Sequence, residues 1–249
     1  MSLTQPKIDD FALSQSVSPF RSLTSRQRTT SLKIGILGSG RMGSNLGLML
    51  AHAGHEVTFS YSMTEGKLAQ LAKQGGPQCG YGSPAQAAAE ADIVLLAVHW
   101  HQIDDVLTAA GSLADKVVLS CCNPLNIEDT DLIIGLTSSG AEVLAEKLKQ
   151  SRIVAAFQTV PSEVLMQVFR VRNQDYRRPS LVFCGNDTTS KTTVASLITQ
   201  LGFDPIDAGQ LKVARYIEPF GMLSGVLAYD TDQGPEWAYH FGRFPRLQG

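Results

Sequence analysis

Three glycines spaced two and three residues apart constrain this chain more than any other feature of its sequence. They lie in the segment KIGILGSGRMGSNLGLML, which begins at Lys33 and ends at Leu50. Alternating aliphatic residues precede the glycines, as in a buried β-strand, and an apolar repeat typical of a helix follows them. The segment therefore predicts a strand, a tight turn and the start of a helix.

The predicted turn has the properties of a phosphate-binding site. The first N–H groups of a helix have no partners within the helix, and the helix dipole adds partial positive charge there, so a bound anion is stabilised. In the dinucleotide-binding pattern, Gly38 permits the turn, Gly40 leaves room for the pyrophosphate, and Gly43 lets the helix pack on the strand. The alternative is an ordinary tight turn; the flanking strand and helix favour the phosphate site.

Length and composition indicate one large domain, or one domain with a small addition. The chain has 249 residues, of which 43% are hydrophobic, and a net charge of −2. Because both signs of charge are dispersed, we expect no nucleic-acid or membrane partner, and no apolar run reaches the roughly 20 residues that span a bilayer. The four cysteines have no C-x-x-C spacing and are interpreted as reduced thiols of a cytoplasmic protein.

The first 31 residues differ in composition from the rest. They are rich in Ser and Thr and have no periodic apolar pattern, which predicts a poorly structured arm with one local helix near residues 10–14. A transit peptide is the alternative, but Asp9, Asp10 and the absence of an amphipathic helix argue against it.

From residue 32 onwards, strand-like and helix-like segments alternate. Such alternation predicts an α/β fold with a doubly wound, mostly parallel sheet, helices on both faces, and a ligand at the carboxyl ends of the strands. The expected strands are 32–38, 56–61, 78–81, 92–98, 116–122, 152–157, 180–185 and 203–207. The expected helices are 41–53, 64–73, 84–90, 101–109, 139–149, 162–169, 189–201 and 211–229.

The last predicted helix has an apolar stripe and contains Pro219, which should bend or interrupt it. We expect this helix to cover the sheet or to pair with a second subunit in a homodimer. Phe220 and Met222 are then expected in the core or the interface and not at a ligand. Arg215 and Glu218 are expected to form an ion pair on the helix surface.

Hydroxyl groups follow the second predicted strand, where a NAD site usually presents Asp or Glu to the ribose. Ser60, Tyr61 and Ser62 stand there without a carboxylate. Because a carboxylate would repel a 2′-phosphate, its absence favours NADP(H), with NAD(H) as the alternative. Lys67 either binds that phosphate or is a surface lysine.

Ring side chains follow the fourth predicted strand. Val98, His99 and Trp100 are expected to line the nicotinamide side of the cleft, with His99 as a hydrogen-bond or proton donor. His99 and His101 lack a third ligand nearby, so no metal site is predicted. The ends of the fifth and sixth strands add further candidates for ligand contact, namely Asn123, Pro124, Gln158, Thr159 and Pro161.

Eight segments between Lys33 and about Phe241 follow one another in a recognisable order: GILGSGRMG, GHEVTFSYS, LLAVHW, NPL, SGAEVLAEKL, VAAFQTVPSEVL, VFCGNDTTSKTTVASLITQLGFDPIDAG and ARYIEPFGML. Over this range the chain resembles the NADPH-dependent oxidoreductases of coenzyme F-420. The resemblance implies a NADP-binding Rossmann domain over residues 32–160 and a small C-terminal α/β lobe over 161–249 that ends in a long helix. It also implies NADP(H) as cofactor and hydride transfer to a deazaflavin stacked on the nicotinamide.

Residue roles follow from the resemblance by position. Ser39 to Met42 would hold the pyrophosphate, Ser62 and Lys67 the 2′-phosphate, and Val98, Gln102 and Ala156 the nicotinamide half. His99 is the candidate catalytic residue. The full set of expected cofactor-binding residues is Gly38, Ser39, Gly40, Arg41, Met42, Gly43, Ser60, Tyr61, Ser62, Lys67, Ala97, Val98, His99, Gln102, Asn123, Pro124 and Ala156.

Three positions depart from the family pattern. Met63 stands where the family commonly has Arg, so a phosphate contact of about 1.5–3 kcal/mol must come from Lys67 or Arg41. His99 replaces the usual Pro and Gln158 the usual Asn, both where the second substrate is expected. The acceptor is therefore coenzyme F-420 or another small molecule such as a quinone, flavin or imine. The remaining alternative is a non-catalytic NADP(H)-sensing protein.

Overall fold

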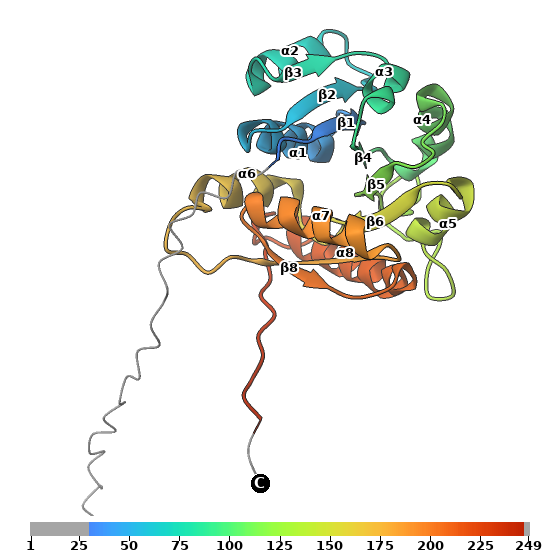
Figure 1. Ribbon diagram of the computed structural model, residues 1–249. Helices are drawn as coiled ribbons and strands as arrows, with labels where there is room; N and C mark the ends of the chain where they lie inside the picture. Colours follow the sequence, from blue (N-terminus) through green and yellow to red (C-terminus); the bar gives the residue numbers. More distant parts are fainter. Residues whose placement is uncertain (1–29, 247–249) are drawn as a thin grey trace, which may run out of the picture. The chain divides into compact units, whose positions relative to one another are not determined.

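One eight-stranded sheet organises the computed structural model, which describes residues 30–246 (Figure 1). The strand order is β3-β2-β1-β4-β5-β6-β7-β8. All eight expected strands are present, with bounds β1 Lys33–Leu37, β2 Glu56–Ser60, β3 Cys79–Tyr81, β4 Ile93–Leu96, β5 Val117–Ser120, β6 Arg152–Ala156, β7 Ser180–Gly185 and β8 Asp204–Asp207. The predicted arm, with its local helix, lies outside the described residues except for Thr30 and Ser31.

Helices cover both faces of the sheet, as the alternation of segments predicts. Side chains of α1, α2, α6 and α7 build the core on one face, and side chains of α3, α4, α5 and α8 build it on the other. The helices are α1 Arg41–His52, α2 Lys67–Gly75, α3 Pro84–Ala89, α4 Ile103–Ala110, α5 Gly140–Lys147, α6 Ser162–Val171, α7 Thr188–Gln200 and α8 Ala214–Tyr229, with the 3₁₀ helices η1 Trp100–Gln102 and η2 Leu211–Val213 before α4 and α8.

β7 runs antiparallel to β6, whereas every other pair of neighbouring strands in the sheet is parallel. In this pair Val154 lies opposite Gly185, and Ala156 lies opposite Phe183. β7 therefore begins at the carboxyl edge of the sheet, where β6 ends. β7 and β8 extend the same sheet, so the proposed division near residue 160 stays a prediction.

The third glycine of the fingerprint acts in helix packing. A Cβ on Gly43 would overlap the carbonyl oxygen of Gly38 and press on the side chain of Ala97. Only glycine therefore lets α1 approach the end of β1 this closely, as the fingerprint predicts.

α8 differs from the predicted helix in two respects. Pro219 lies inside it without interrupting it. Leu223, which belongs to the expected apolar stripe, is 54% exposed, whereas Ile217 is buried. The stripe is broken because α8 packs against β7 and α5 over only part of its surface, which leaves Leu223 exposed.

The expected ion pair between Arg215 and Glu218 does not form, because both side chains find other partners. Arg215 donates two hydrogen bonds to Glu142 of α5, at 2.8 and 2.7 Å. Glu218 is fully buried and accepts hydrogen bonds from the N–H groups of Gly140 and Ala141, at 2.9 and 3.0 Å. Burial raises the pKa of Glu218 to about 7, although these two donors lower it. Glu218 is thus a buried cap on the first turn of α5.

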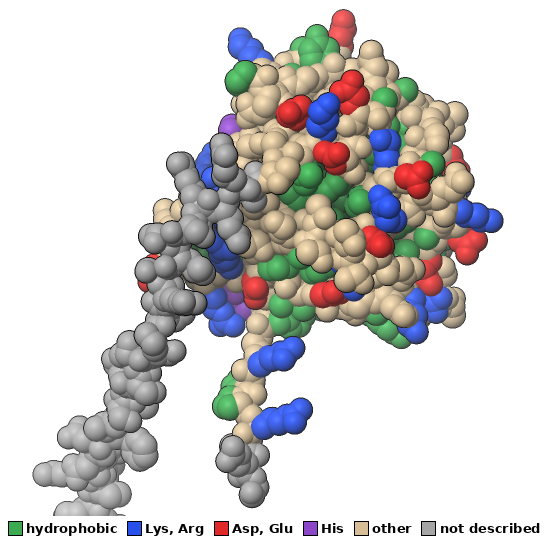
Figure 2. All heavy atoms as spheres, in the orientation of Figure 1, with side chains coloured by type: hydrophobic (Ala, Val, Ile, Leu, Met, Phe, Trp, Pro, Cys, Tyr) green, Lys and Arg blue, Asp and Glu red, His purple; other side chains and the backbone are tan. Residues whose placement is uncertain are grey.

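All four cysteines have free thiols, and three of them are buried. Burial raises the pKa of Cys122 to about 11 and that of Cys184 to about 12, so both thiols are protonated at neutral pH. None of the helices formed by residues 30–246 is long and apolar enough to cross a membrane. On the face in Figure 2, acidic and basic side chains are interspersed.

Candidate functional site

A cleft of about 740 Å³ opens at the carboxyl edge of the parallel strands. Its walls are the glycine turn, the segments that follow β2, β4, β5 and β6, and the second half of α8. This volume is within the range of small-molecule sites, and the position is where α/β sheets bind their ligands. The cleft is therefore the candidate functional site.

The glycine turn leads into the first turn of α1, and the unpaired N–H groups at this site belong to that helical turn. The N–H groups of Gly38 and Ser39 are bound to the carbonyl oxygens of Ser60 and Tyr61, at 3.2 and 3.1 Å. The first turn of α1, which begins at Arg41, has no side-chain cap. Because the N–H groups of such a turn have no acceptor within the helix, they are free to bind an anion.

Gly40 keeps the approach to these groups open. Its φ of −67° is allowed for any residue, and a Cβ placed on it meets no atom within 4 Å. Glycine at this position is therefore not required by the packing of the chain. Its absence of a side chain leaves the space that the fingerprint assigns to a pyrophosphate.

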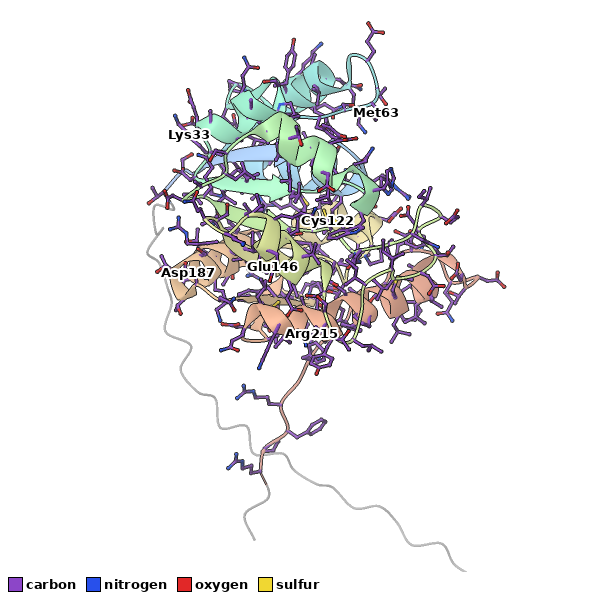
Figure 3. All side chains as sticks on the ribbon, turned by 90° about the vertical axis from the view of Figure 1, so that its right-hand side faces the viewer. Lys33, Met63, Cys122, Glu146, Asp187 and Arg215 are labelled. Atoms are coloured by element: carbon purple, nitrogen blue, oxygen red, sulfur yellow. The ribbon has the colours of Figure 1, made fainter. Side chains whose placement is uncertain are left out.

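The segment after β2 forms a second polar region of the cleft. Tyr61 has a positive φ of 57° at the start of this segment, and the hydroxyl of Ser62 accepts a hydrogen bond from the N–H of Thr64 at 3.1 Å. Lys67 is the first residue of α2, whose N-terminus has no side-chain cap. Met63 is 86% exposed at the outer edge (Figure 3). One lysine, a helix start and hydroxyl groups thus meet where a phosphate would be stabilised.

His99 lies in the cleft with a carboxylate beside it. Its Nδ1 is 3.2 Å from a carboxylate oxygen of Asp129, in the loop after β5, and its ring stacks on that of His101 with 5.7 Å between centroids. Among residues 30–246, no group of three or more His, Cys, Asp or Glu side chains is arranged to hold a metal ion. The pairing with Asp129 leaves Nε2 as the ring nitrogen available to a ligand.

The structure brings thirteen of the seventeen expected cofactor-binding residues to the cleft. The four others do not line it. Gly43 packs against Gly38, Pro124 packs against Gly140, the hydroxyl of Ser60 donates to the carbonyl oxygen of Ile36, and Ala156 is fully buried within β6. The residues that line it are Gly38, Ser39, Gly40, Arg41, Met42, Tyr61, Ser62, Lys67, Ala97, Val98, His99, Gln102 and Asn123; those that do not are Gly43, Ser60, Pro124 and Ala156.

The roles of two further candidates differ from expectation. The hydroxyl of Thr159 is buried against the Tyr239 hydroxyl at 2.7 Å and does not reach the cleft. Met222, expected in the core or an interface, lines the cleft, whereas Phe220 packs edge-on against Tyr239.

The wall formed by α8 was not predicted. Its signal in the sequence is a set of small residues at helical spacing, Gly221, Ser224 and Gly225, which let a helix approach other backbone closely. A Cβ on Gly221 would overlap the carbonyl oxygen of Gln158. The cleft is lined by six residues of α8 and by Asp230, which directly follows the helix. The six are Gly221, Met222, Ser224, Gly225, Val226 and Tyr229.

A hydrogen-bonded cluster ties the glycine turn to α6 and α8. Arg41 donates to Glu163 at 2.9 Å, and the hydroxyl of Tyr229 donates to the other carboxylate oxygen of Glu163 at 2.8 Å. Burial opposes ionisation of Glu163, but the hydrogen bonds from Tyr229, from its own backbone N–H and from Ser162, together with the charge of Arg41, outweigh it and lower its pKa. Burial and the neighbouring Glu163 raise the pKa of Tyr229 to about 12. The cluster holds the Arg41 guanidinium, an expected phosphate contact, at the mouth of the cleft.

Two amide side chains line the cleft beside a residue with a positive φ. In the part of the chain that the structure describes, Nε2 and Oε1 of Gln158 and Oδ1 of Asn123 are buried without hydrogen-bond partners. Phe157 precedes Gln158 with a φ of +71°. An unpaired buried polar group costs about 1–3 kcal/mol, and a residue held in this backbone region costs a similar amount. Such costs concentrate at ligand sites.

Comparison with known proteins connects this cleft to a redox family. The profile of the family "NADP oxidoreductase coenzyme F420-dependent" matches residues 33–124. The F420-dependent NADP reductase of Methanocaldococcus jannaschii is 30% identical over 201 residues, which cover 75% of this chain and 88% of that protein. The crystal structure of a candidate F420-dependent NADP reductase from Arthrobacter sp. FB24 superposes with a TM-score of 0.75 at 25% identity, covering 86% of this chain and all of that one.

A second group of relatives is longer than this chain. Metalloreductase STEAP3 of Rattus norvegicus is 27% identical over 189 residues. The match covers 75% of this chain but only 36% of that protein. The chain therefore spans about a third of the metalloreductase it matches and most of the archaeal reductase.

Proposed function

The chain belongs to the family of coenzyme F420-dependent NADP oxidoreductases and is an NADP(H)-dependent oxidoreductase, and on that premise we propose that it transfers a hydride between the nicotinamide of NADP(H) and a flat redox acceptor. The acceptor that the family favours is the deazaflavin coenzyme F-420. A quinone, a flavin or an imine is the alternative.

The observation that carries the proposal is the open space above Gly40 at the uncapped start of α1. A pyrophosphate seated there would place the two halves of a dinucleotide along the carboxyl edge of the sheet. The adenosine side would then reach Ser62 and Lys67, and the nicotinamide side would reach Val98 and Gln102. All four of these residues line the same cleft, which supports an extended dinucleotide as its ligand.

The residues of the cleft fit hydride transfer, which requires little acid–base chemistry from the protein. When bound, NADPH supplies the hydride, and the protein orients the two reactants and excludes water. Apolar side chains of Val98, Val160 and Met222 provide the water-poor wall. His99, oriented by Asp129, is the group we propose to deliver a proton to an acceptor that gains negative charge on reduction.

The test of the proposed function is NADPH oxidation with a panel of acceptors. Absorbance at 340 nm is followed with coenzyme F-420, FMN, menadione and a cyclic imine as separate acceptors. We expect turnover with F-420 at a kcat/KM that exceeds the others by about tenfold or more, because only one acceptor should match the cleft in shape and hydrogen bonding. Preferred turnover of another acceptor would assign the alternative substrate class. An absence of turnover with every acceptor would contradict the proposal and favour an NADP(H) sensor.

Replacing Lys67 with Ala should weaken binding of NADPH far more than binding of NADH. A lysine paired with a phosphate contributes about 1.5–3 kcal/mol, which corresponds to roughly 10- to 100-fold in Kd. We therefore expect that loss for NADPH and less than about threefold for NADH, measured by titration calorimetry.

Lys73 supplies the matched control, because it lies exposed in the last turn of the same helix. Lys73→Ala should bind both nucleotides like the unmodified protein. Equal losses for NADPH and NADH in Lys67→Ala would show that Lys67 does not contact the 2′-phosphate.

Two expectations about the chain's surroundings stay predictions. The homodimer through α8 is supported by the exposed apolar side chains of Tyr216 and Leu223 on that helix. The cytoplasmic location rests on the sequence composition and on the free thiols.

A further inference from the structure

The side chain of Gln158 is the most unusual polar group in the cleft. It is only 6% exposed, yet among the described residues neither its donor nor its acceptor atom has a partner. Oδ1 of Asn123, close by, is buried and unpaired in the same way. Because buried polar groups in folded proteins are almost always paired, these atoms need a partner from outside residues 30–246.

The surrounding backbone holds the two amides in fixed positions. Nδ2 of Asn123 donates to the carbonyl oxygen of Gln158 at 3.2 Å, so its Oδ1 is left as the free acceptor. Gly221 of α8 packs directly against that carbonyl. The positive φ of Phe157 sets the direction of the backbone where the chain leaves β6. The amides are therefore preorganised, as groups in a binding site are.

The chemistry of the amides defines the ligand that fits them. The glutamine carboxamide offers one donor beside one acceptor, and its complement is an N–H group beside a C=O group. Cys121, Val160 and Met222 make the rest of this end of the cleft apolar. The fitting ligand is therefore a flat ring with one amide edge, either a carboxamide or a cyclic imide.

We propose that Gln158 and Asn123 form an amide-binding subsite, which binds the N–H and C=O edge of a ring in the cleft. The subsite rests on the proposed function, because two rings of that reaction have such an edge. One is the nicotinamide, through its carboxamide. The other is the acceptor, where it is a flavin or deazaflavin with a cyclic imide.

Equilibrium binding to the unmodified protein and to Gln158→Leu tests the subsite and separates the two sources. The first arm compares NADPH with its reduced 3-acetylpyridine analogue, in which a methyl group replaces the amide NH2. The second arm compares a 5-deazaflavin with its N3-methyl derivative, in the presence of NADP+. In one of the arms, the unmodified protein should bind the amide-bearing ligand about tenfold more tightly, and Gln158→Leu should bind both ligands of that pair equally.

Loss of preference in the first arm assigns the subsite to the nicotinamide, and loss in the second assigns it to the acceptor. Both support the proposal. Preferences that are absent in the unmodified protein, or unchanged in Gln158→Leu, overturn it. Both arms measure binding, so they report on the subsite even if the acceptor panel shows no turnover.

Two further variants serve as a second test and as a control. Gln158→Met keeps the length of the side chain but removes both the amide donor and the amide acceptor. It should therefore also lose the preference, and it replaces Gln158→Leu as the test if that variant fails to fold. Gln150→Leu makes the same change at an exposed position on the surface and should keep the preference of the unmodified protein. Thermal unfolding of each variant reports whether the fold is retained.

Discussion

Replacing Gly40 with Leu should abolish binding of NADPH and leave the fold intact. The backbone at Gly40 is allowed for any residue, and a Cβ there meets no atom within 4 Å, so the protein itself tolerates a side chain. The leucine would instead fill the space above the first turn of α1. Losing the phosphate interactions at a helix start, at about 1.5–3 kcal/mol for each charged hydrogen bond, should weaken binding by roughly 100-fold or more. Titration calorimetry with NADPH measures the loss, and thermal unfolding should give an unchanged Tm.

Gly43→Ala is the contrasting variant within the same fingerprint. A Cβ at Gly43 would overlap the carbonyl oxygen of Gly38, so even alanine must separate α1 from β1. We expect this variant to lose both stability and binding, whereas Gly40→Leu loses binding alone. An unchanged affinity for NADPH in Gly40→Leu would reject the phosphate site.

The protein should become less stable as the pH rises from 5 to 8, because Glu218 loses its proton in this range. Its pKa is about 7 in the folded state, raised by burial from the usual value of 4.5. The folded state therefore holds this proton in a pH range where the unfolded state has released it. The stabilisation from the raised pKa is full below about pH 4.5 and is lost as the pH rises through 7. A shift of this size corresponds to a loss of about 3 kcal/mol in the free energy of unfolding.

The measurement is a difference between variants, because other groups also titrate in this range. Burial lowers the pKa of His55, which opposes the trend by destabilising the protein as the pH falls. In Glu218→Gln, the change in unfolding free energy between pH 5 and 8 should differ from that of the unmodified protein by about 3 kcal/mol. Denaturant unfolding at each pH measures this difference.

Glu146 provides the control for Glu218. It lies exposed on α5, the helix that Glu218 caps, and Figure 3 shows it on the surface beside α5, with Arg215 of α8 below. Glu146→Gln should reproduce the pH dependence of the unmodified protein. The charge of Glu142 adds to the raised pKa of Glu218, and Glu142 is itself paired with Arg215. A pH dependence in Glu218→Gln equal to that of the unmodified protein would show that Glu218 does not titrate in this range.

The elements of the fold could be predicted because their signals are local. All eight strands and eight helices lie within a few residues of the segments expected from periodicity, and Ser83 and Ser139 cap α3 and α5 where those helices were expected to begin. The direction of β7 was harder to predict from the sequence. It depends on the edge of the sheet that the chain has reached when β7 begins, and no periodic pattern in residues 172–179 records this.

The candidate site was predictable wherever it follows a parallel strand. Turns after such strands meet at one edge, so Gly40, Tyr61, Val98 and Asn123 could be assigned to one cleft before any contact was known. The wall made by α8 escaped prediction because a helix can present any of its faces to the sheet. Met222 therefore could not be placed in the cleft from its sequence position.

The sequence by itself determined the glycine turn, the order of strands and helices along the chain, and the edge of the sheet at which the cleft opens, since each of these follows from short-range spacing and from the geometry of parallel strands. Only the tertiary structure decided the partners of single side chains across the fold: Glu218 beneath α5, Arg215 on Glu142, and Gln158 left without one. The physical reason is the separation along the chain of the residues that set each property. Backbone periodicity is set by neighbours a few residues apart, whereas burial and hydrogen-bond pairing depend on segments that meet only after the chain has folded.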